Sequence, residues 1–423
     1  MTDPRGLLID LFNTAVDAAD PRKILASFLP EDSNRKAVVI GAGKAAASMA
    51  SSLEQHWQGP LSGLVVTRYG HQLTCRSIEV VEASHPVPDD MGEKVSRRML
   101  ALVEPLGEED LVICVISGGG SSLLSLPAPT LNLKDKQHIN KALLKCGATI
   151  SEMNTVRKHL SAIKGGRLAA ACFPAQVITF AISDVPGDDP TVIASGPTVA
   201  DPSTSADAIA ILQKYHIDVP EHVLLWLKDE QAETLKPGDP VFKNTQFHMI
   251  STPNDSLQAA HKQAVAMGLN TLVLGDDIEG ESREVAKVHA GIVRSIIKHQ
   301  QPVAAPCIIL SGGETTVTLK GSGRGGRNAE FLLSLANCLQ GMKGVYALAA
   351  DTDGIDGSED NAGAFLSPQS WDRGIKKGID AAAMLENNDG YSYFEALGDL
   401  LITGPTLTNV NDFRAILVLP EEQ

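Results

Sequence analysis

Short apolar runs that end in glycine or polar residues alternate along this chain with alanine- and leucine-rich stretches of helical periodicity. Most runs are apolar at successive positions, which is typical of strands buried on both faces of a sheet. We therefore predict an α/β fold with mostly parallel sheets that helices cover on each side. Ligands bind beyond the carboxyl ends of such strands, so we expect the site there. The runs are Ala37–Ile40, Leu111–Ile116, Val177–Ile182, Thr271–Leu274, Pro306–Leu310 and Val345–Ala350.

The chain length predicts two domains, because 423 residues exceed what one ordinary core holds. The sequence Leu235-Lys236-Pro237-Gly238-Asp239-Pro240 interrupts the helical pattern, so we place a domain boundary near residues 235–243. Two further strand-like runs, Leu400–Gly404 and Ala415–Leu419, fit either domain.

Composition excludes several classes of partner. Lys and Arg total 36 against 51 Asp and Glu, and the net charge of −15 disfavours nucleic acid and anionic membranes. The sequence contains no uninterrupted apolar run of about 18 residues, so we expect no membrane-spanning helix. Asp10 interrupts the first apolar stretch, so we expect no secretory signal. The six cysteines lack CxxC spacing, which favours free thiols and a cytoplasmic localisation.

The segment Gly41–Ala47 matches the GxGxxA fingerprint of dinucleotide-binding loops, in which the glycines let the backbone approach a pyrophosphate. The following strand ends at Thr67-Arg68 without an acidic residue, which disfavours NAD, while Arg68 leaves NADP open. Lys44 stands in the first helical turn, where the dipole disfavours a cation. We favour an anion-facing Lys44 over a solvated one.

A second glycine-rich loop follows the strand Leu111–Ile116. Its consecutive glycines and hydroxyls form an anion nest, and it lacks the G-x-S-x-G arrangement of a serine nucleophile. Phosphate binding is therefore favoured over a flexible loop or a nucleophile. The predicted nucleotide-binding residues of the two loops are Gly41, Gly43, Ser117, Gly118, Gly119, Gly120, Ser121 and Ser122.

Carboxylates and arginines mark other strand ends. The loop Ser183–Pro190 holds Asp184, Asp188 and Asp189, which suit magnesium with phosphate oxygens or, equally, Asx-turn chemistry. Asp351–Gly357 lacks the ligand spacing of a calcium loop, so a catalytic or metal-holding carboxylate is favoured there. Gly321–Asn328 places two arginines, Arg324 and Arg327, among four glycines, which suits an anion.

Taken together, eight segments between residues 38 and 413 resemble the glycerate 2-kinase family with a MOFRL C-terminal domain, some of whose members carry the label hydroxypyruvate reductase. The segments are VIGAGKAAASMA, SHPVPD, VISGGGSSLL, NTVRKHLSAIKGGRLA, ISDVPGDDPTVIASGPTVADPST, SGGETTVTLKGSGRGGRNAEF, AADTDGIDGSEDNAGAF and TGPTLTNVNDF. The resemblance implies a three-layer Rossmann-like domain at residues 1–240 with a mostly parallel sheet. It also implies a smaller α/β domain of MOFRL type at residues 241–423, with the final strands able to return to the first domain.

The implied activity is phosphorylation of D-glycerate at the 2-hydroxyl by ATP with Mg²⁺, in a cleft between the domains. Phosphoryl transfer needs positive charge around the migrating group, a metal and an oriented hydroxyl. Our hypothesis is that Lys44 neutralises the phosphoryl group and that Arg324 or Arg327 clamps the glycerate carboxylate or the phosphoryl oxygens. Asp189 and Asp351 are the first candidates to hold magnesium or orient the hydroxyl. Asp184 and Asp353 are further candidates to hold the metal.

Two other classes stay open. An NADP-dependent hydroxypyruvate reductase would use Gly41–Ala47 and Arg68, and it has only His85 as a candidate for ketone reduction. That reading leaves the Ser117–Ser122 loop unexplained. A nucleotide- or sugar-phosphate-binding sensor would have no need of the carboxylates at the strand ends. Small-molecule partners are expected, and the sequence does not decide whether the enzyme forms a homodimer.

Overall fold

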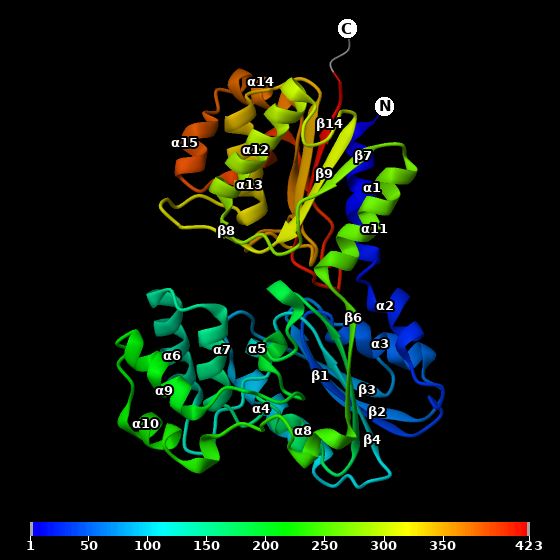
Figure 1. The fold of residues 1–423 in the computed structure, drawn as a ribbon, viewed down its shortest axis with the longest axis vertical. Coiled ribbons are helices and arrows are strands. Elements are labelled where there is room, and N and C mark those ends of the chain that lie inside the picture. The colour runs from blue at the N-terminus through cyan, green and yellow to red at the C-terminus, as the bar shows by residue number, and fades with distance from the viewer. Residues whose placement is uncertain (1–2, 421–423) are drawn as a thin grey trace. The chain divides into compact units, whose positions relative to one another are not determined.

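The computed structural model describes residues 3–420, which form two compact units (Figure 1). The first unit holds residues 21–250, and the second holds residues 3–20 together with residues 251–420. The amino-terminal helix α1 thus packs with the second unit, whereas the sequence pattern places residues 1–240 in one domain. The strands that follow residue 400 lie in the sheet of the second unit.

The first unit is built on a six-stranded sheet in the order β3-β2-β1-β4-β5-β6. The strands are β1 (Ala37–Ala42), β2 (Leu61–Arg68), β3 (Ile78–Ala83), β4 (Leu111–Ile116), β5 (Gln176–Ile182) and β6 (Thr245–Ser251). β1 pairs in parallel with β2 and β4, and the pairs β2–β3 and β4–β5 are parallel too. All six residues of β1 and of β4 are buried, as the continuous apolar runs predict.

Helices cover both faces of this sheet, which makes the three-layer α/β arrangement that the sequence predicts. α4 and α8 contribute Val95, Met99 and Leu168 to a core with Ile40 and Cys114. A further helical cluster of α6, α7, α9 and α10 has its own core around Leu143, Val156 and Trp226. The helices of the unit are α2 (Pro21–Ile24), α3 (Ala46–His56), α4 (Asp90–Val103), α5 (Gly120–Leu123), α6 (Leu133–Cys146), α7 (Ile150–His159), α8 (Arg167–Cys172), α9 (Ser205–Lys214) and α10 (Glu221–Leu227).

The second unit holds a six-stranded sheet in the order β13-β12-β11-β14-β9-β7 and a two-stranded sheet of β8 and β10. The strands are β7 (Asn270–Val273), β8 (Gly280–Glu281), β9 (Cys307–Gly313), β10 (Thr315–Thr316), β11 (Val345–Asp351), β12 (Gly363–Leu366), β13 (Leu400–Leu401) and β14 (Asp412–Val418). The expectation of parallel pairing is wrong for most of this sheet. β14, the last strand of the chain, inserts between β9 and β11 and runs antiparallel to both.

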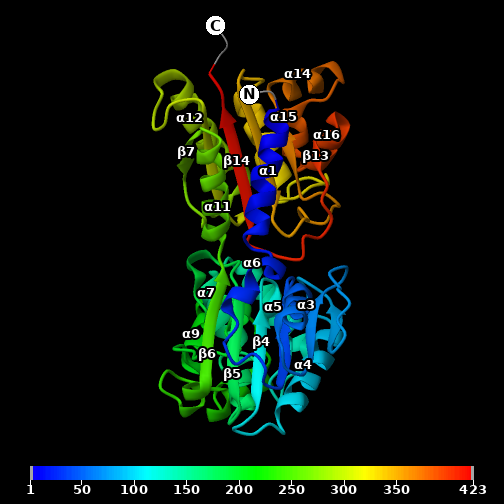
Figure 2. The ribbon, with the colours of Figure 1, turned by 90° about the vertical axis from the view of Figure 1, so that its right-hand side faces the viewer.

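The two faces of this second sheet have separate cores (Figure 2). α1 and α11 cover one face with Leu11, Phe12 and Leu257, and α12, α13 and α16 cover the other with Val293 and Phe331. The helices are α1 (Pro4–Asp17), α11 (Pro253–Ala266), α12 (Ser282–His299), α13 (Arg327–Leu339), α14 (Pro368–Lys376), α15 (Ala381–Glu386) and α16 (Gly390–Leu397). None of the helices between residues 3 and 420 is both long and apolar enough to cross a lipid bilayer.

Candidate active site

The two glycine-rich loops of the first unit lie side by side, because β1 and β4 are parallel neighbours that end at the same edge of the sheet. The backbone N–H of Lys44 donates to the carbonyl oxygen of Gly118 at 2.8 Å, and the N–H of Ala45 donates to the hydroxyl of Ser117 at 3.0 Å. The N–H of Ser117 donates in turn to the carbonyl oxygen of Ala42 at 3.1 Å. The structure thus brings together the loop that carries Lys44 and the Ser117–Ser122 loop.

The first two glycines of the fingerprint are explained by the neighbouring strand. A Cβ on Gly41 would lie 2.0 Å from the carbonyl oxygen of Val115, and one on Gly43 would lie 2.0 Å from the hydroxyl oxygen of Ser117. Gly43 also has a φ of +141°, which side chains disfavour. Close approach of β4 therefore requires these glycines, and their contact with a nucleotide stays a prediction.

The Ser117–Ser122 loop leads into the short helix α5. Gly119 has a φ of +79° at the start of this helix, a conformation that favours glycine. No group between residues 3 and 420 accepts a hydrogen bond from the backbone N–H of Gly118 or Gly119. Ser117 is fully buried and Ser121 is half-buried, its hydroxyl 2.8 Å from that of Ser195. Two adjacent amide donors, those of Gly118 and Gly119, are what an anion nest needs.

Basic side chains surround this loop. A Cβ on Gly119 would lie 2.9 Å from Cδ2 of His85 and 3.5 Å from Cγ of Lys44. Burial lowers the pKa of His85 to about 3, helped by the charges of Lys44 and Arg68. Burial and the same two charges lower the pKa of His71 to about 4. Both imidazoles are therefore neutral near pH 7, and the positive charge here comes from Lys44 and Arg68. His71 lies in none of the motifs, so the sequence did not single it out.

The carboxylates predicted as metal ligands differ in exposure and in their hydrogen bonds. Asp189 is exposed, and its Oδ1 accepts a hydrogen bond from the N–H of Thr191 at 2.8 Å, which is Asx-turn geometry. Asp184 is half-buried, and Asp353 is buried with its Oδ1 accepting from the N–H of Ile355 at 2.8 Å. Within the described part of the chain, no three His, Cys, Asp or Glu side chains lie together in a geometry that could hold a metal ion. Metal binding by these aspartates stays a prediction.

In the second unit, Arg327 joins two carboxylates at the ends of neighbouring strands. Its Nη2 donates to Oδ2 of Asp351 and its Nε to Oδ1 of Asp412, each at 2.7 Å. Asp351 and Asp412 face each other across the β11–β14 pair, and Arg414 donates to Asp412 at 2.6 Å from the other side. Burial acts to lower the pKa of Arg327, but the charges of Asp412, Asp351 and Glu314 raise it well above its usual value.

Arg324 lies outside this network. Its guanidinium donates to Oε2 of Glu359 from Nε at 3.0 Å and from Nη2 at 2.5 Å, and it lies over the ring of Tyr391. About half of its side chain is exposed, 52% against 22% for Arg327. The sequence could not separate the two arginines, whereas the structure gives them different partners. Which of them contacts the substrate stays a prediction.

Asp356, which the sequence analysis assigned no role, caps helix α13. Its two carboxylate oxygens accept hydrogen bonds from the N–H groups of Asn328 and Ala329 at 3.0 and 2.9 Å. Burial nevertheless raises the pKa of Asp356 to about 7. The cap fixes the start of α13, and with it Arg327, the first residue of the helix.

Known proteins are similar to this chain over nearly its whole length. A family model described as Domain of unknown function (DUF4147) matches residues 7–228, and the MOFRL family matches residues 307–412. A D-glycerate 2-kinase of Thermotoga maritima is 40% identical over 99% of this chain and 100% of that protein. A protein of Agrobacterium vitis provisionally named hydroxypyruvate reductase is 54% identical over 98% of this chain and 94% of that protein. The crystal structure of a glycerate kinase from Thermotoga maritima superposes with a TM-score of 0.88 at 39% identity, over 98% of this chain and 99% of that one.

Proposed function

The chain belongs to the glycerate kinase family, with a DUF4147 region followed by a MOFRL region, and on that premise we propose that it transfers the γ-phosphoryl group of ATP to the 2-hydroxyl of D-glycerate. The observation that carries this proposal is the junction of Lys44 with the Ser117–Ser122 loop. That junction combines a lysine with two adjacent amide donors at the carboxyl edge of a parallel sheet. These are the groups that phosphoryl transfer requires.

In this proposal the N–H groups of Gly118 and Gly119 hold phosphate oxygens, and the ammonium of Lys44 offsets the charge that develops on the migrating group. Arg324 and Arg327 are the candidates to bind phosphoryl oxygens or the glycerate carboxylate. Arg327 is held in place by Asp351 and Asp412, so an anion that binds it would share the guanidinium with these carboxylates.

Magnesium, when bound, would neutralise part of the charge of the phosphate oxygens. It usually takes only one or two carboxylates from a protein together with phosphates and water, so it does not need a cluster of three protein ligands, which the described residues lack. We keep Asp184, Asp189 and Asp353 as its proposed ligands. Asp351 is proposed to orient the hydroxyl or to act through Arg327, which it contacts.

A hydroxypyruvate reductase is the second candidate, because the relative from Agrobacterium vitis carries that name. Ketone reduction needs a proton donor, and His85 was the one candidate that the sequence offered. Its pKa of about 3 leaves its imidazole unprotonated near pH 7, so it is poorly suited to protonate the alkoxide. The low pKa of His85 therefore favours the kinase over the reductase.

One paired assay separates the two functions. The full-length protein is incubated with D-glycerate, ATP and Mg²⁺ while ADP release is followed, and in parallel with hydroxypyruvate and NADPH while NADPH oxidation is followed. The proposal expects glycerate-dependent ADP release and no NADPH oxidation. The reverse result would establish the reductase.

The six free thiols of the chain support the predicted cytoplasmic localisation.

A further inference from the structure

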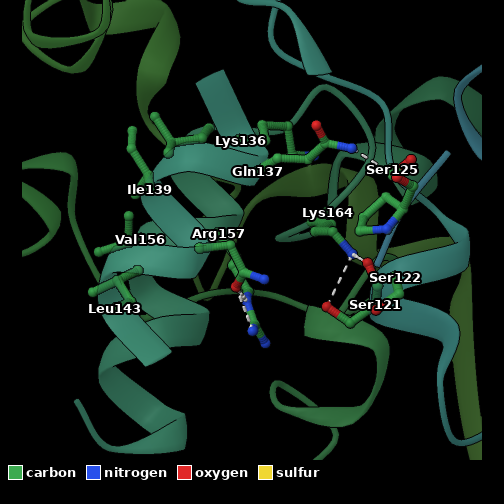
Figure 3. A pocket seen from close by; sticks show the side chains of 13 residues that line it. Ser121, Ser122, Ser125, Lys136, Gln137, Ile139, Leu143, Val156, Arg157 and Lys164 are labelled. Atoms are coloured by element: carbon green, nitrogen blue, oxygen red, sulfur yellow. Dashed lines mark hydrogen bonds between the residues drawn. The ribbon is translucent and has the colours of Figure 1, made fainter. Parts of the chain in front are cut away.

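A small cavity of about 50 Å³ opens between α5, α6 and α7 of the first unit (Figure 3). Ser121 of the glycine-rich loop forms part of its wall, and apolar side chains of α6 and α7, such as Leu143 and Val156, form another part. Three cationic side chains also line it, namely Lys136, Arg157 and Lys164. A cavity with an apolar wall and several cations is a chemical environment for an anionic ligand.

Among the described residues, 3–420, the three cations have only neutral hydrogen-bond partners. Nζ of Lys164 donates to the carbonyl oxygen of Ser121 at 2.7 Å, as Figure 3 shows, and it lies 3.3 Å from the Ser121 hydroxyl. The guanidinium of Arg157 donates to the amide oxygen of Asn140 at 2.7 and 2.5 Å. Nζ of Lys136 donates to the carbonyl oxygen of Leu126 at 3.2 Å.

No carboxylate between residues 3 and 420 forms an ion pair with any of these three cations. The neighbouring Lys158 shows the contrast. It is as deeply buried as Lys164, with 4% against 1% of its surface exposed, and it forms an ion pair with Asp201 at 3.1 Å. Acidic residues are abundant, 51 in all, yet among residues 3–420 the cavity receives only the attraction of Glu93 on Lys136, without an ion pair. Lys164 is buried, and Lys136 and Arg157 are half-buried. Cations in such surroundings without an ion pair are unfavourable, so an anion that enters the cavity would stabilise them.

The pKa values agree with this geometry. Burial lowers the pKa of Lys136 to about 7, and the nearby charge of Arg157 lowers it further, against the attraction of Glu93. Burial, with the charges of Lys136 and Arg157, lowers the pKa of Lys164 well below its usual value. A bound anion would reverse part of this effect, because it favours the charged form of each lysine.

We propose that this cavity binds the carboxylate of the acceptor substrate, a short 2-hydroxy acid. The inference rests on the proposed function for the identity of the ligand. Ser121 belongs both to the cavity wall and to the loop that we propose holds phosphates. A 2-hydroxy acid anchored by its carboxylate at Lys136 and Arg157 would therefore keep its hydroxyl close to that loop. If the glycerate carboxylate binds in this cavity, Arg324 or Arg327 would bind the phosphoryl oxygens.

Direct binding tests this inference without turnover. D-glycerate is titrated calorimetrically into the full-length wild-type protein and into the variants Lys136→Met and Arg157→Gln. Lys141→Met is the matched control, since Lys141 is an exposed lysine of the same helix. Loss of a charge-assisted hydrogen bond should weaken glycerate binding by about tenfold or more in the two cavity variants. The control should bind as the wild type does, and glycerol, which lacks the carboxylate, should not bind.

The kinetic counterpart is a rise in KM for D-glycerate in Lys136→Met with little change in KM for ATP. Unchanged glycerate affinity in folded Lys136→Met and Arg157→Gln would overturn the inference, and so would a wild-type protein that binds no D-glycerate. If D-glycerate binds and the cavity variants lose it but no phosphoryl transfer occurs, the inference stands and the proposed function fails. If transfer occurs and the variants keep their glycerate affinity, the proposed function stands alone.

Discussion

The backbone N–H of Lys44 donates to the carbonyl oxygen of Gly118 at 2.8 Å, which joins the two glycine-rich loops of the first unit. This hydrogen bond fixes the start of the segment that carries the Lys44 side chain against the loop with two adjacent amide donors. The backbone of Lys44 and the anion nest are thereby held together at one edge of the sheet, within reach of the Lys44 side chain.

Replacing Lys44 by alanine should lower kcat for glycerate-dependent ADP release by about a hundredfold or more, because the ammonium stabilises charge in the transition state. The backbone hydrogen bond to Gly118 is kept in this variant, so the fold should be unaffected. Steady-state kinetics and circular dichroism check both expectations. Lys228→Ala, at an exposed lysine of the same unit, is the control. Near-normal turnover in Lys44→Ala would remove this residue from the mechanism.

Gly43→Ala should destabilise the protein by about 1–3 kcal/mol, because the new Cβ would lie 2.0 Å from the Ser117 hydroxyl and φ is positive. Gly107→Ala is the control, since a Cβ there meets no heavy atom within 4 Å. Urea unfolding measures both variants. Wild-type stability in Gly43→Ala combined with lost ATP binding would show instead that this glycine serves the nucleotide directly.

Arg327→Ala should reduce the free energy of unfolding by about 3–5 kcal/mol, because it removes the ion pair of the buried Asp351 carboxylate and leaves Arg414 as the ion-pair partner of Asp412. Arg324→Ala should reduce it by no more than about 1 kcal/mol, since its ion pair with Glu359 lies at the surface. Chemical denaturation compares the two. Equal losses of unfolding free energy in the two variants would contradict the different environments of the two arginines. The kcat of each folded variant shows which arginine serves the reaction.

Lys136→Met should stabilise the ligand-free protein, and more strongly at acidic than at alkaline pH. Lys136 has a pKa of about 7 in the folded state, where burial is the main cause, against an ordinary lysine value of 10.5. Between these values the unfolded chain binds a proton that the folded protein lacks, so wild-type stability rises with pH. Below about pH 7 Lys136 is protonated in both the folded and the unfolded state, so the whole free-energy cost of burying the charged side chain remains.

The measurement is the free energy of unfolding of the wild type and of Lys136→Met at about pH 6 and pH 9. The variant's advantage should shrink as the pH rises. An advantage that is constant or that grows with pH would show that Lys136 is not a destabilised cation in the folded protein.

His85→Gln should leave the shape of the pH profile of kcat unchanged between about pH 5 and 8, because a histidine with a pKa of about 3 does not titrate there. Its control is the wild-type profile recorded in the same buffers. An inflection near neutral pH in the kcat for glycerate-dependent ADP release that disappears in His85→Gln would show that this imidazole carries a proton in the reaction.

The strands of the first sheet could be predicted from the sequence because runs such as Leu111–Ile116 are apolar on both faces and end in glycines. The same logic placed the Gly41–Lys44 and Ser117–Ser122 loops at strand ends, where ligands bind. That the two loops meet follows from the pairing of β1 with β4, which the structure shows and local pattern did not predict.

Features that depend on contacts between distant residues could not be predicted. The insertion of β14 between β9 and β11 joins residues about a hundred positions apart, as Asp412 and Gly313 show. The pairing of Arg327 with Asp412 arises from the same insertion. Lys164 stood within a basic stretch in the sequence, but only the fold shows that it is buried against Ser121 while Lys158 pairs with Asp201.

The position of the phosphoryl group on the product is the sharpest test of the proposed transfer to the 2-hydroxyl. The full-length protein is incubated with D-glycerate, ATP and Mg²⁺, and the product is identified by phosphorus NMR against authentic 2-phosphoglycerate and 3-phosphoglycerate. The account predicts 2-phosphoglycerate from the wild type and a loss of about a hundredfold or more in its rate of formation in Lys44→Ala. Formation of 3-phosphoglycerate, or of no phosphorylated glycerate, would contradict it.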